Sequence, residues 1–326
     1  MRSRKPIGNK THWTKHHYGW LERVIQRDIT SNKKAVIVGG GPAGMEAARV
    51  LRERGMDVIL FEASSDLGGQ IALAAKDQLH NQIWGTVYWL QSQLERLDVD
   101  VRYNCYAEES EVLAEQPDLV IIATGGMPES IGIDGGEHAA SSWDVLSGEL
   151  CSGQVLLFDD HGDHHAGVAA DVLAGNGAEV LHLTPDRTSF MELGPTNSAV
   201  VLRDLCRKGV QFEVLKDLIG IEKRKARKVA RLRHTLTGDL SEKIVDHIVI
   251  ERGIGSLAGV YEALKPTSRN AGIVDLSALV SNQLVLPEVN TEGTFDLVRI
   301  GDAISGRNLH AAIYDALRIG LLYQNW

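Results

Sequence analysis

The sequence predicts an α/β protein with two domains, each containing a mostly parallel sheet covered by helices on both faces. Its 326 residues exceed the roughly 250–300 residues at which a single hydrophobic core usually stops growing. A strand–turn–helix–strand pattern at residues 35–64 returns at residues 155–184. Elsewhere short apolar runs alternate with helical patterns, which is typical of strands in a parallel sheet.

Composition and charge exclude several classes of protein. Hydrophobic residues make up 44% and charged residues 24% of the chain, which are ordinary proportions for a soluble protein. The net charge of −9 argues against nucleic acid or an anionic membrane as a general partner, and no apolar run approaches the ~18 residues that span a bilayer. Because the three cysteines are widely separated and the N-terminus lacks an apolar signal segment, we expect a cytoplasmic protein.

The first unit begins with a short apolar strand, "AVIV", at residues 35–38. Pro42 stands near the first position of the next helix, where its missing N–H costs nothing. We expect that helix to cover residues 43–54 and Gly55 to end it. The following run "DVILFE", residues 57–62, is the second predicted strand.

Three further elements complete this unit before a boundary. Residues 81–97 place apolar side chains at helical spacing. The runs "DVRY" at 100–103 and "DLVIIATGG" at 118–126 are predicted strands. Glycine and proline then accumulate at residues 128–136, which indicates a boundary between domains.

The second unit repeats the order of the first and then changes character. Its predicted strands and helices are, in order, residues 155–158, 166–177, 179–184, 197–209 and 211–215. Residues 220–251 alternate enough to predict an antiparallel meander, with a turn at residues 236–239.

After residue 255 the chain is expected to return to the first domain. A last strand is predicted at residues 295–302 and an amphipathic closing helix at residues 308–323. The predicted domains are therefore an N-terminal arm at residues 1–31, a discontinuous domain at 32–134 plus 256–326, and an inserted domain at 135–255. The arm contains Trp13 and Trp20, so we expect it to pack on another chain or domain.

Three glycines between the first strand and its helix are typical of a dinucleotide site. Gly39 permits a tight turn, Gly41 lets a pyrophosphate approach the backbone, and Gly44 lets the helix pack closely on the strand. The helix N-terminus adds free N–H groups and partial positive charge. Glu62 ends the second strand, where its carboxylate can accept hydrogen bonds from ribose hydroxyls and disfavours a 2′-phosphate.

Three later motifs fit the same ligand. "DLGGQ" at residues 66–70 supplies another backbone loop, "ATGG" at 123–126 ends a strand at the same sheet edge, and "IGDA" places Asp302 before the last helix. Both units are thus predicted to be Rossmann-like dinucleotide-binding domains, with the second inserted in the first as in glutathione reductase. The candidate nucleotide-binding residues are Gly39, Gly41, Pro42, Ala43, Gly44, Glu62, Gly69, Gln70, Ala107, Thr124, Gly125 and Asp302.

These motifs recur in this order in flavoproteins with two dinucleotide-binding domains. More narrowly, "FEASSDLGGQIALAA" and "VRIGDAISGRNLHAAIYDALRIG" resemble the C-terminal half of the trimethylamine dehydrogenase, histamine dehydrogenase and 2,4-dienoyl-CoA reductase family. The resemblance covers the chain from about Lys33 onward. It implies FAD or ADP in the first domain, since the amine dehydrogenases hold ADP there and the reductases hold FAD.

The same resemblance implies partners. Full-length members carry an N-terminal barrel with FMN and a cysteine-ligated 4Fe–4S cluster, and this sequence contains neither. We therefore expect FMN and the 4Fe–4S cluster in a partner chain, a barrel-containing flavoprotein subunit, and an electron-transfer acceptor protein as a further partner. Because the substrate chemistry would occur in the barrel, no catalytic residue is assigned to this chain.

The second unit is predicted to be a degenerate NAD(P)-binding domain. Its loop reads "DDHGDHHAG", and Asp159 and Asp160 stand where a pyrophosphate would bind. Carboxylates beside a pyrophosphate are repulsive, by about 1 kcal/mol per pair in water and up to about 4 near a protein surface. We interpret the histidines of this loop as part of a polar surface loop and not as zinc ligands, so we predict no metal. The basic run at residues 222–234 is interpreted as a solvated strand face.

The resemblance and the degenerate loop together favour one function over two alternatives. The preferred interpretation is the nucleotide-binding subunit or fragment of a flavin-dependent oxidoreductase of the amine dehydrogenase or demethylase type. The alternatives are a free-standing NAD(P)H-dependent FAD reductase and a non-catalytic ADP-binding assembly subunit. The substrate and electron acceptor stay open at this point.

Overall fold

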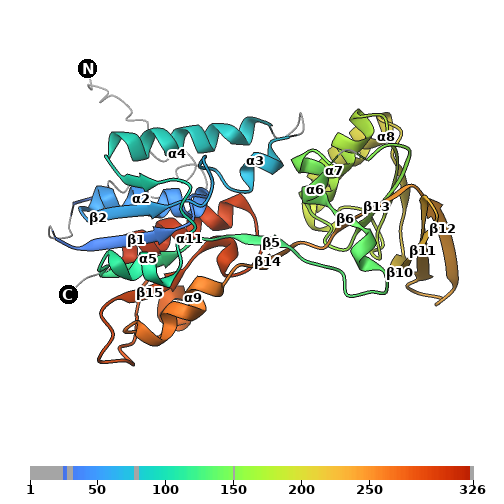
Figure 1. Cartoon of the computed structure of the whole chain (residues 1–326). Coiled ribbons are helices and arrows are strands. Elements are labelled where there is room, and N and C mark those ends of the chain that lie inside the picture. The colour runs from blue at the N-terminus through green and yellow to red at the C-terminus, as the bar shows by residue number, and fades with distance from the viewer. Residues whose placement is uncertain (1–24, 28–31, 77–80, 150, 324–326) are drawn as a thin grey trace, which may run out of the picture.

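The structure, a computed structural model, describes residues 25–27, 32–76, 81–149 and 151–323. In this part of the chain, two sheet-based units are joined by a pair of short strands (Figure 1). The N-terminal arm expected at residues 1–31 lies almost entirely outside the described residues.

The first unit contains a five-stranded parallel sheet in the order β15-β4-β1-β2-β3. Its strands are β1 (Lys34–Val38), β2 (Asp57–Phe61), β3 (Asp100–Arg102), β4 (Leu119–Ile122) and β15 (Asp296–Arg299). The strands β1 to β4 precede the second unit in sequence and β15 follows it, so the second unit is inserted into the first. This confirms the predicted two-unit α/β fold.

Helices cover both faces of this sheet (Figure 1). They are α2 (Pro42–Arg54), α3 (Ile71–Ala74), η1 (Asn81–Ile83), α4 (Trp84–Arg96), α5 (Glu109–Ala114), α9 (Gly259–Leu264), η4 (Lys265–Thr267), α10 (Leu276–Val280), η5 (Gly301–Ala303) and α11 (Leu309–Leu322). As predicted, Pro42 begins α2 and Gly55 ends it in the left-handed conformation, with φ 112°. A Cβ atom on Gly320 would lie 2.7 Å from Val50 Cγ1, so glycine allows α11 to pack closely on α2.

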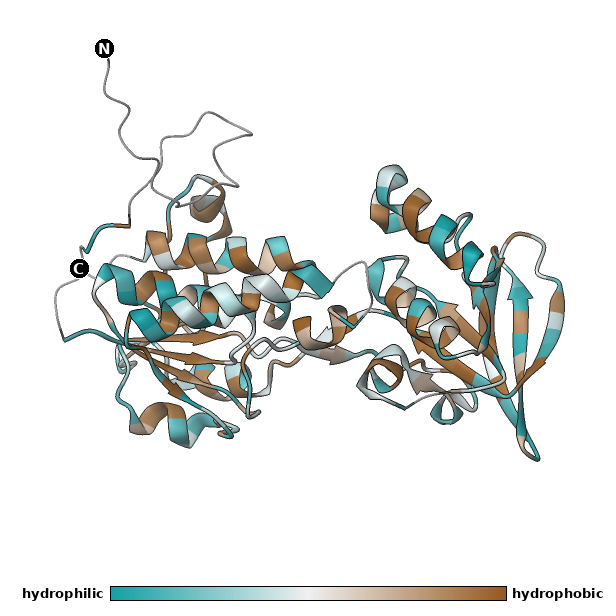
Figure 2. Ribbon diagram, turned by 90° about the horizontal axis from the view of Figure 1, so that it is seen from above, coloured by the Kyte–Doolittle hydropathy of each residue, from teal (hydrophilic) through white to brown (hydrophobic). Residues whose placement is uncertain are grey.

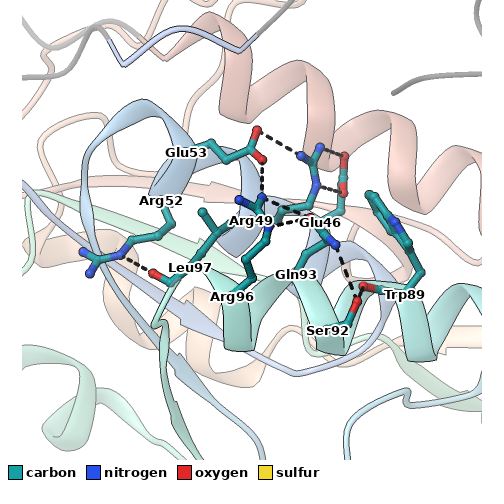
Figure 3. Close-up of polar contacts among 9 residues, drawn as sticks. All are labelled: Glu46, Arg49, Arg52, Glu53, Trp89, Ser92, Gln93, Arg96 and Leu97. Carbon is teal, nitrogen blue, oxygen red and sulfur yellow. Dashed lines mark hydrogen bonds and ion pairs between the residues drawn. The ribbon is translucent and has the colours of Figure 1, made fainter. Parts of the chain in front are cut away.

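A polar network fixes α4 on α2 (Figure 3). The guanidinium of Arg49 donates two hydrogen bonds of 2.7 Å to the carboxylate of Glu46. Both side chains are buried. The carboxylate of Glu53 accepts hydrogen bonds from Arg49 on its own helix and from Arg96 on α4. Each buried charge therefore has a charged partner, as burial requires.

The second unit has its own five-stranded parallel sheet, in the order β6-β13-β7-β8-β9. Its strands are β6 (Ala140–Ser141), β7 (Gln154–Asp159), β8 (Glu179–Leu183), β9 (Gln211–Glu213) and β13 (His247–Glu251). Its helices are η2 (Gly136–His138), α6 (Ser142–Ser147), α7 (His164–Gly175), η3 (Met191–Leu193) and α8 (Gly194–Arg207). Figure 2 shows mostly apolar residues along these strands and both polar and apolar residues along the helices that cover them.

The predicted meander at residues 220–251 is correct only in part. The strands β10 (Lys216–Arg224), β11 (Arg227–His234) and β12 (Leu240–Val245) form an antiparallel sheet with the predicted turn between the last two. The final strand, β13, instead lies inside the parallel sheet beside β7. Four of its five residues are buried, and a continuous apolar run is typical of a strand covered on both faces.

The chain crosses between the units twice, at adjacent places. The strand β5 (Gly126–Pro128) leaves the first unit, and β14 (Ile254–Ser256) returns to it. The two pair antiparallel, with Gly126 opposite Ser256. A Cβ atom on Gly126 would lie 2.1 Å from Ile254 Cγ2, so glycine is needed for this close pairing.

Candidate functional site

The glycine loop after β1 combines two structural glycines with one that faces open space. Gly39 has φ +108°, and a Cβ atom on it would lie 2.3 Å from the carbonyl oxygen of Ala123. A Cβ atom on Gly44 would lie 1.9 Å from the carbonyl oxygen of Gly39. At Gly41 no atom lies within 4 Å of that position. The loop thus has the form in which a pyrophosphate can approach the backbone at Gly41.

The second glycine loop, "DLGGQ", lies directly against the first. The backbone N–H of Gly68 donates to the carbonyl oxygen of Gly40 over 3.0 Å. The Cβ position of Gly69 is 3.3 Å from the Cα of Gly41. Two runs of backbone 28 residues apart in sequence, Gly41 and Gly69, therefore form one surface.

These loops border a cleft of about 890 Å³ at the carboxyl ends of the strands. Eleven of the twelve predicted residues line it: Gly39, Gly41, Pro42, Ala43, Glu62, Gly69, Gln70, Ala107, Thr124, Gly125 and Asp302. The exception, Gly44, packs the helix on the loop. Ligands of open α/β sheets bind at this edge, and the volume is in the range of cofactor clefts.

Glu62 occupies the end of the cleft after β2. One carboxylate oxygen accepts the backbone N–H of Gly40 over 2.7 Å, and the other accepts the N–H of Ser64 over 2.8 Å. The Ser64 hydroxyl also donates to the second oxygen, Oε1, over 2.5 Å. Each carboxylate oxygen has two lone-pair sites, so Oε2, which accepts only the Gly40 N–H, can still accept a ligand hydroxyl. The sequence analysis missed Gly40, whose Cβ position is 2.3 Å from Leu67 Cδ2. The run of three glycines in "GGGPAG" is the only signal that pointed to it.

Asp302 occupies the opposite end, in the turn η5 after β15. Its side chain accepts the backbone N–H of Arg307 over 3.0 Å and a hydrogen bond from Gln70. Burial raises the pKa of the Asp302 carboxyl, and the nearby Arg307 and His165 reduce that rise only in part. Gln70 Nε2 is also 3.4 Å from the Cβ position of Gly125, so the predicted residues Gln70, Gly125 and Asp302 form one group.

Two other predicted residues hold the cleft wall together. The hydroxyl of Thr124 donates to the carbonyl oxygen of Leu257 over 2.6 Å, just after the strand that returns from the second unit. Ala107 is buried in the wall. Thr124 and Ala107 therefore contribute backbone groups and steric shape to the cleft wall, and neither side chain carries a charge.

The second unit also reaches this cleft, which the sequence analysis did not foresee. Its contributions to the wall are Trp143, Leu146, Asp163, His164, His165 and Val168. They come from α6 and from the first turns of α7. They belong to no motif predicted for this site, and the nearest such motif, "ATGG", ends 17 positions before Trp143. Only the arrangement of the two units brings these residues to the cleft.

In the loop of the second unit, the carboxylate of Asp159 does not act in the way that the sequence predicted. Asp159 was expected to repel a pyrophosphate, but its carboxylate is fully buried. One oxygen accepts the backbone N–H groups of His161 and Gly162, over 3.1 and 2.8 Å. The Asp159 side chain therefore takes the loop donors that a phosphate would use. Asp160 does not face a ligand freely either, because it pairs with Arg252 at 2.9 Å.

A buried polar chain supports Asp159. The other carboxylate oxygen lies 3.1 Å from His182 Nε2, and His182 Nδ1 lies 3.2 Å from the hydroxyl of Ser189. All three residues have side-chain types found in hydrolase triads. The three side chains are buried, and those of His182 and Asp159 have no exposed surface. A substrate therefore cannot reach them, and we assign this network of three residues a structural role.

The described ranges contain neither a metal-binding cluster nor a membrane-spanning helix. Among the described residues, no group of three histidine, cysteine or acidic side chains is arranged to hold a metal ion. Within those ranges, too, no helix has both the length and the apolar character needed to cross a membrane.

The fold consists of two Rossmann-like α/β units, and the cleft lies at the carboxyl ends of the strands of the first unit. Residues 37–96 match the NAD(P)-binding Rossmann-like domain family. The chain superposes on Lactococcus lactis thioredoxin reductase with TM-score 0.64 and 19% identity, covering 89% of this chain and 97% of that one. It superposes on histamine dehydrogenase from Rhizobium sp. 4-9 with TM-score 0.74 and 22% identity, covering 91% of this chain and 44% of that one.

The relatives found by sequence similarity have names that specify a reaction. A probable N-methylproline demethylase of Rhizobium meliloti is 42% identical over 289 residues, which cover 88% of this chain and 43% of that protein. An N,N-dimethylglycine/sarcosine dehydrogenase of Chromohalobacter salexigens is 40% identical over 319 residues, covering 94% and 46%. The chain thus spans about half the length of the curated relatives it matches.

Proposed function

We propose that this chain is the nucleotide-binding part of a flavin-dependent oxidoreductase of the amine dehydrogenase or demethylase type. The observation that carries the proposal is the cleft of the first unit, where the glycine loops around Gly41 and Gly69 meet between the carboxylates of Glu62 and Asp302. The match to demethylase and dehydrogenase relatives supports the class of reaction.

Each group of the cleft has a task toward FAD or ADP. Glu62 accepts the ribose hydroxyls, and the backbone near Gly41 and the N-terminus of α2 bind the diphosphate. Asp302 can accept a hydroxyl of the ribityl chain, which FAD has and ADP lacks. When bound, FAD supplies an isoalloxazine ring that takes up electrons and passes them on.

Substrate oxidation is proposed to occur in a partner barrel that carries FMN and a 4Fe–4S cluster. The support is that the chain spans only 43–46% of its demethylase and dehydrogenase relatives. An electron-transfer protein would then accept the electrons.

The second candidate is a free-standing NAD(P)H-dependent FAD reductase. Near-complete coverage of a thioredoxin reductase favours it at the level of fold. The buried Asp159, which accepts the loop N–H groups itself, opposes it. The third candidate, a non-catalytic ADP-binding assembly subunit, shares the cleft but needs no flavin.

One experiment separates these candidates. The purified chain is gently denatured, and the released nucleotide is identified by mass spectrometry. FAD or ADP, together with activity only after a barrel protein is added, supports the proposal. ADP from a chain whose addition leaves the activity of the barrel protein unchanged supports the assembly subunit, and amine turnover by the isolated chain would overturn the assignment of the chemistry to a partner.

A further inference from the structure

The cleft of the first unit is bounded at one end by a helix of the second. The helix α7 begins at His164, whose N–H is capped by the side chain of Asp163 over 2.7 Å. Asp163, His164 and His165 all line the cleft. In this structure, therefore, the start of α7 faces the ligand site of the first unit.

His165 has an unfulfilled hydrogen-bonding group at this wall. Its Nδ1 atom is buried without a hydrogen-bond partner among the described residues, so the interior of the protein and not the cleft surrounds this atom. The Nε2 atom is the ring nitrogen that can reach a ligand, because among the described residues it has no hydrogen-bond partner and it is not buried. His165 is also close enough to Asp302 for its charge to act on that carboxyl, which places it at the Asp302 end of the cleft.

The order of strands shows which part of a ligand would reach His165. Glu62 follows β2, the glycine loop follows β1, Gly125 follows β4, and Asp302 follows β15. Three strand spacings separate β2 from β15, about 14 Å in all. An adenosine diphosphate bound to Glu62 and the glycine loop occupies the first part of this distance. Only a ligand that continues beyond the diphosphate, as FAD does, extends to the wall that contains His165.

The connection between the units keeps this wall in place. The hydroxyl of Ser256 on β14 donates to the carbonyl oxygen of Asp302 over 2.7 Å. The hydroxyl of Thr124 donates to Leu257, directly after that strand. The chain that returns from the second unit is thus fixed to the first unit by hydrogen bonds at the Asp302 end of the cleft.

We propose that His165 is a specificity-determining residue that selects FAD over ADP by hydrogen bonding to the polar edge of the flavin. This edge carries carbonyl oxygens and ring nitrogens that accept hydrogen bonds and an N–H that donates one, so either imidazole tautomer finds a partner. The second unit then serves as a closing wall for the flavin. This inference rests on the proposed function of the first cleft.

The test compares the affinities for FAD and for ADP in the full-length chain, freed of nucleotide, by isothermal titration calorimetry. The variants are His165→Ala, His165→Gln and the control His138→Ala, an exposed histidine outside the cleft. We expect His165→Ala to weaken FAD binding about three- to tenfold, the worth of one hydrogen bond, and to leave ADP binding unchanged. His165→Gln, which keeps a donor and an acceptor, should recover part of the loss.

The unchanged ADP affinity also reports that the first unit is folded. The visible absorption bands of bound FAD give a second measurement, because a lost hydrogen bond at the ring edge shifts them. An equal loss for FAD and ADP in His165→Ala, or no loss for either, overturns the role of His165. A wild-type chain that binds FAD no more tightly than ADP overturns it too, while leaving the proposed function intact. A wild-type chain that binds neither nucleotide overturns both.

Discussion

Glu62 shows how one side chain can serve both the fold and the ligand. Both of its carboxylate oxygens accept backbone N–H groups, from Gly40 in the glycine loop and from Ser64 after β2. Its oxygen Oε2 keeps one lone-pair site, and the side chain lines the cleft. The carboxylate therefore holds the loop in shape before any ribose hydroxyl binds, which is the preorganisation that favours tight binding.

The substitution Glu62→Gln should weaken FAD and ADP binding to the same extent, by about tenfold or 1.4 kcal/mol. An amide has only one acceptor oxygen, so its NH₂ group must face one of the two backbone N–H groups. The control is Glu137→Gln, a largely exposed residue outside the cleft. Calorimetric titration gives both affinities, and unchanged binding by the Gln variant would remove Glu62 from the site.

The buried carboxyl of Asp302 should make the free energy of unfolding depend on pH. Burial raises the pKa of its carboxyl in the folded chain above the ordinary value of 3.8, so above that value the folded state holds more protons than the unfolded state. The contribution of this group to the free energy of unfolding is therefore present at low pH and is lost as pH rises through the raised pKa.

In Asp302→Asn this loss should be absent, so the variant's free energy of unfolding should gain on that of the wild type as pH rises above the ordinary pKa of 3.8. Urea unfolding at several pH values measures it. Asp204→Asn is the control of opposite sign, because the Arg203 side chain lowers the pKa of Asp204. Parallel pH profiles for wild type and Asp302→Asn would contradict the prediction.

At the scale of elements, the sequence predicted what local patterns determine. The limits of α2 followed from Pro42 and Gly55, and the helix at 84–96 from apolar spacing. β13 was misplaced because its partner, β7, is almost 90 residues away in sequence, and strand pairing at that distance leaves no local mark. His165 was missed as a wall residue for the same reason, and the domain boundaries at 134 and 256 stay predictions.

Arg49 and Glu46 form a buried ion pair on α2, and the guanidinium of Arg49 lies over the ring of Trp89 on α4 (Figure 3). Arg49→Ala should lower the free energy of unfolding by about 3 kcal/mol, because it leaves the carboxylate of Glu46 buried without its partner. Arg96→Ala is the matched control, since its side chain is half exposed and such pairs contribute under about 1 kcal/mol. Chemical denaturation of both variants measures the difference, and equal losses would show that the buried pair is no more important than the surface one.

At the scale of the whole molecule, the two units have similar sheets and opposite loops. In the first, Gly41 leaves the backbone open to a ligand. In the second, the carboxylate of Asp159 accepts the corresponding N–H groups and is held by His182. A duplicated fold can thus retain one nucleotide site and convert the other into a wall, because the parallel sheet depends on its apolar core and not on the loop.

This difference predicts that NADH and NADPH do not reduce FAD bound to the chain. A nicotinamide dinucleotide would have to displace Asp159, whose removal from its donors would leave a buried carboxylate unpaired, at a cost of several kcal/mol. The measurement is the flavin absorbance under anaerobic conditions after either nucleotide is added in excess. Dithionite is the positive control, because it reduces an accessible flavin directly. Rapid bleaching by NADH or NADPH would show that the second unit still delivers hydride, and the free-standing reductase would then replace the amine dehydrogenase type as the better assignment.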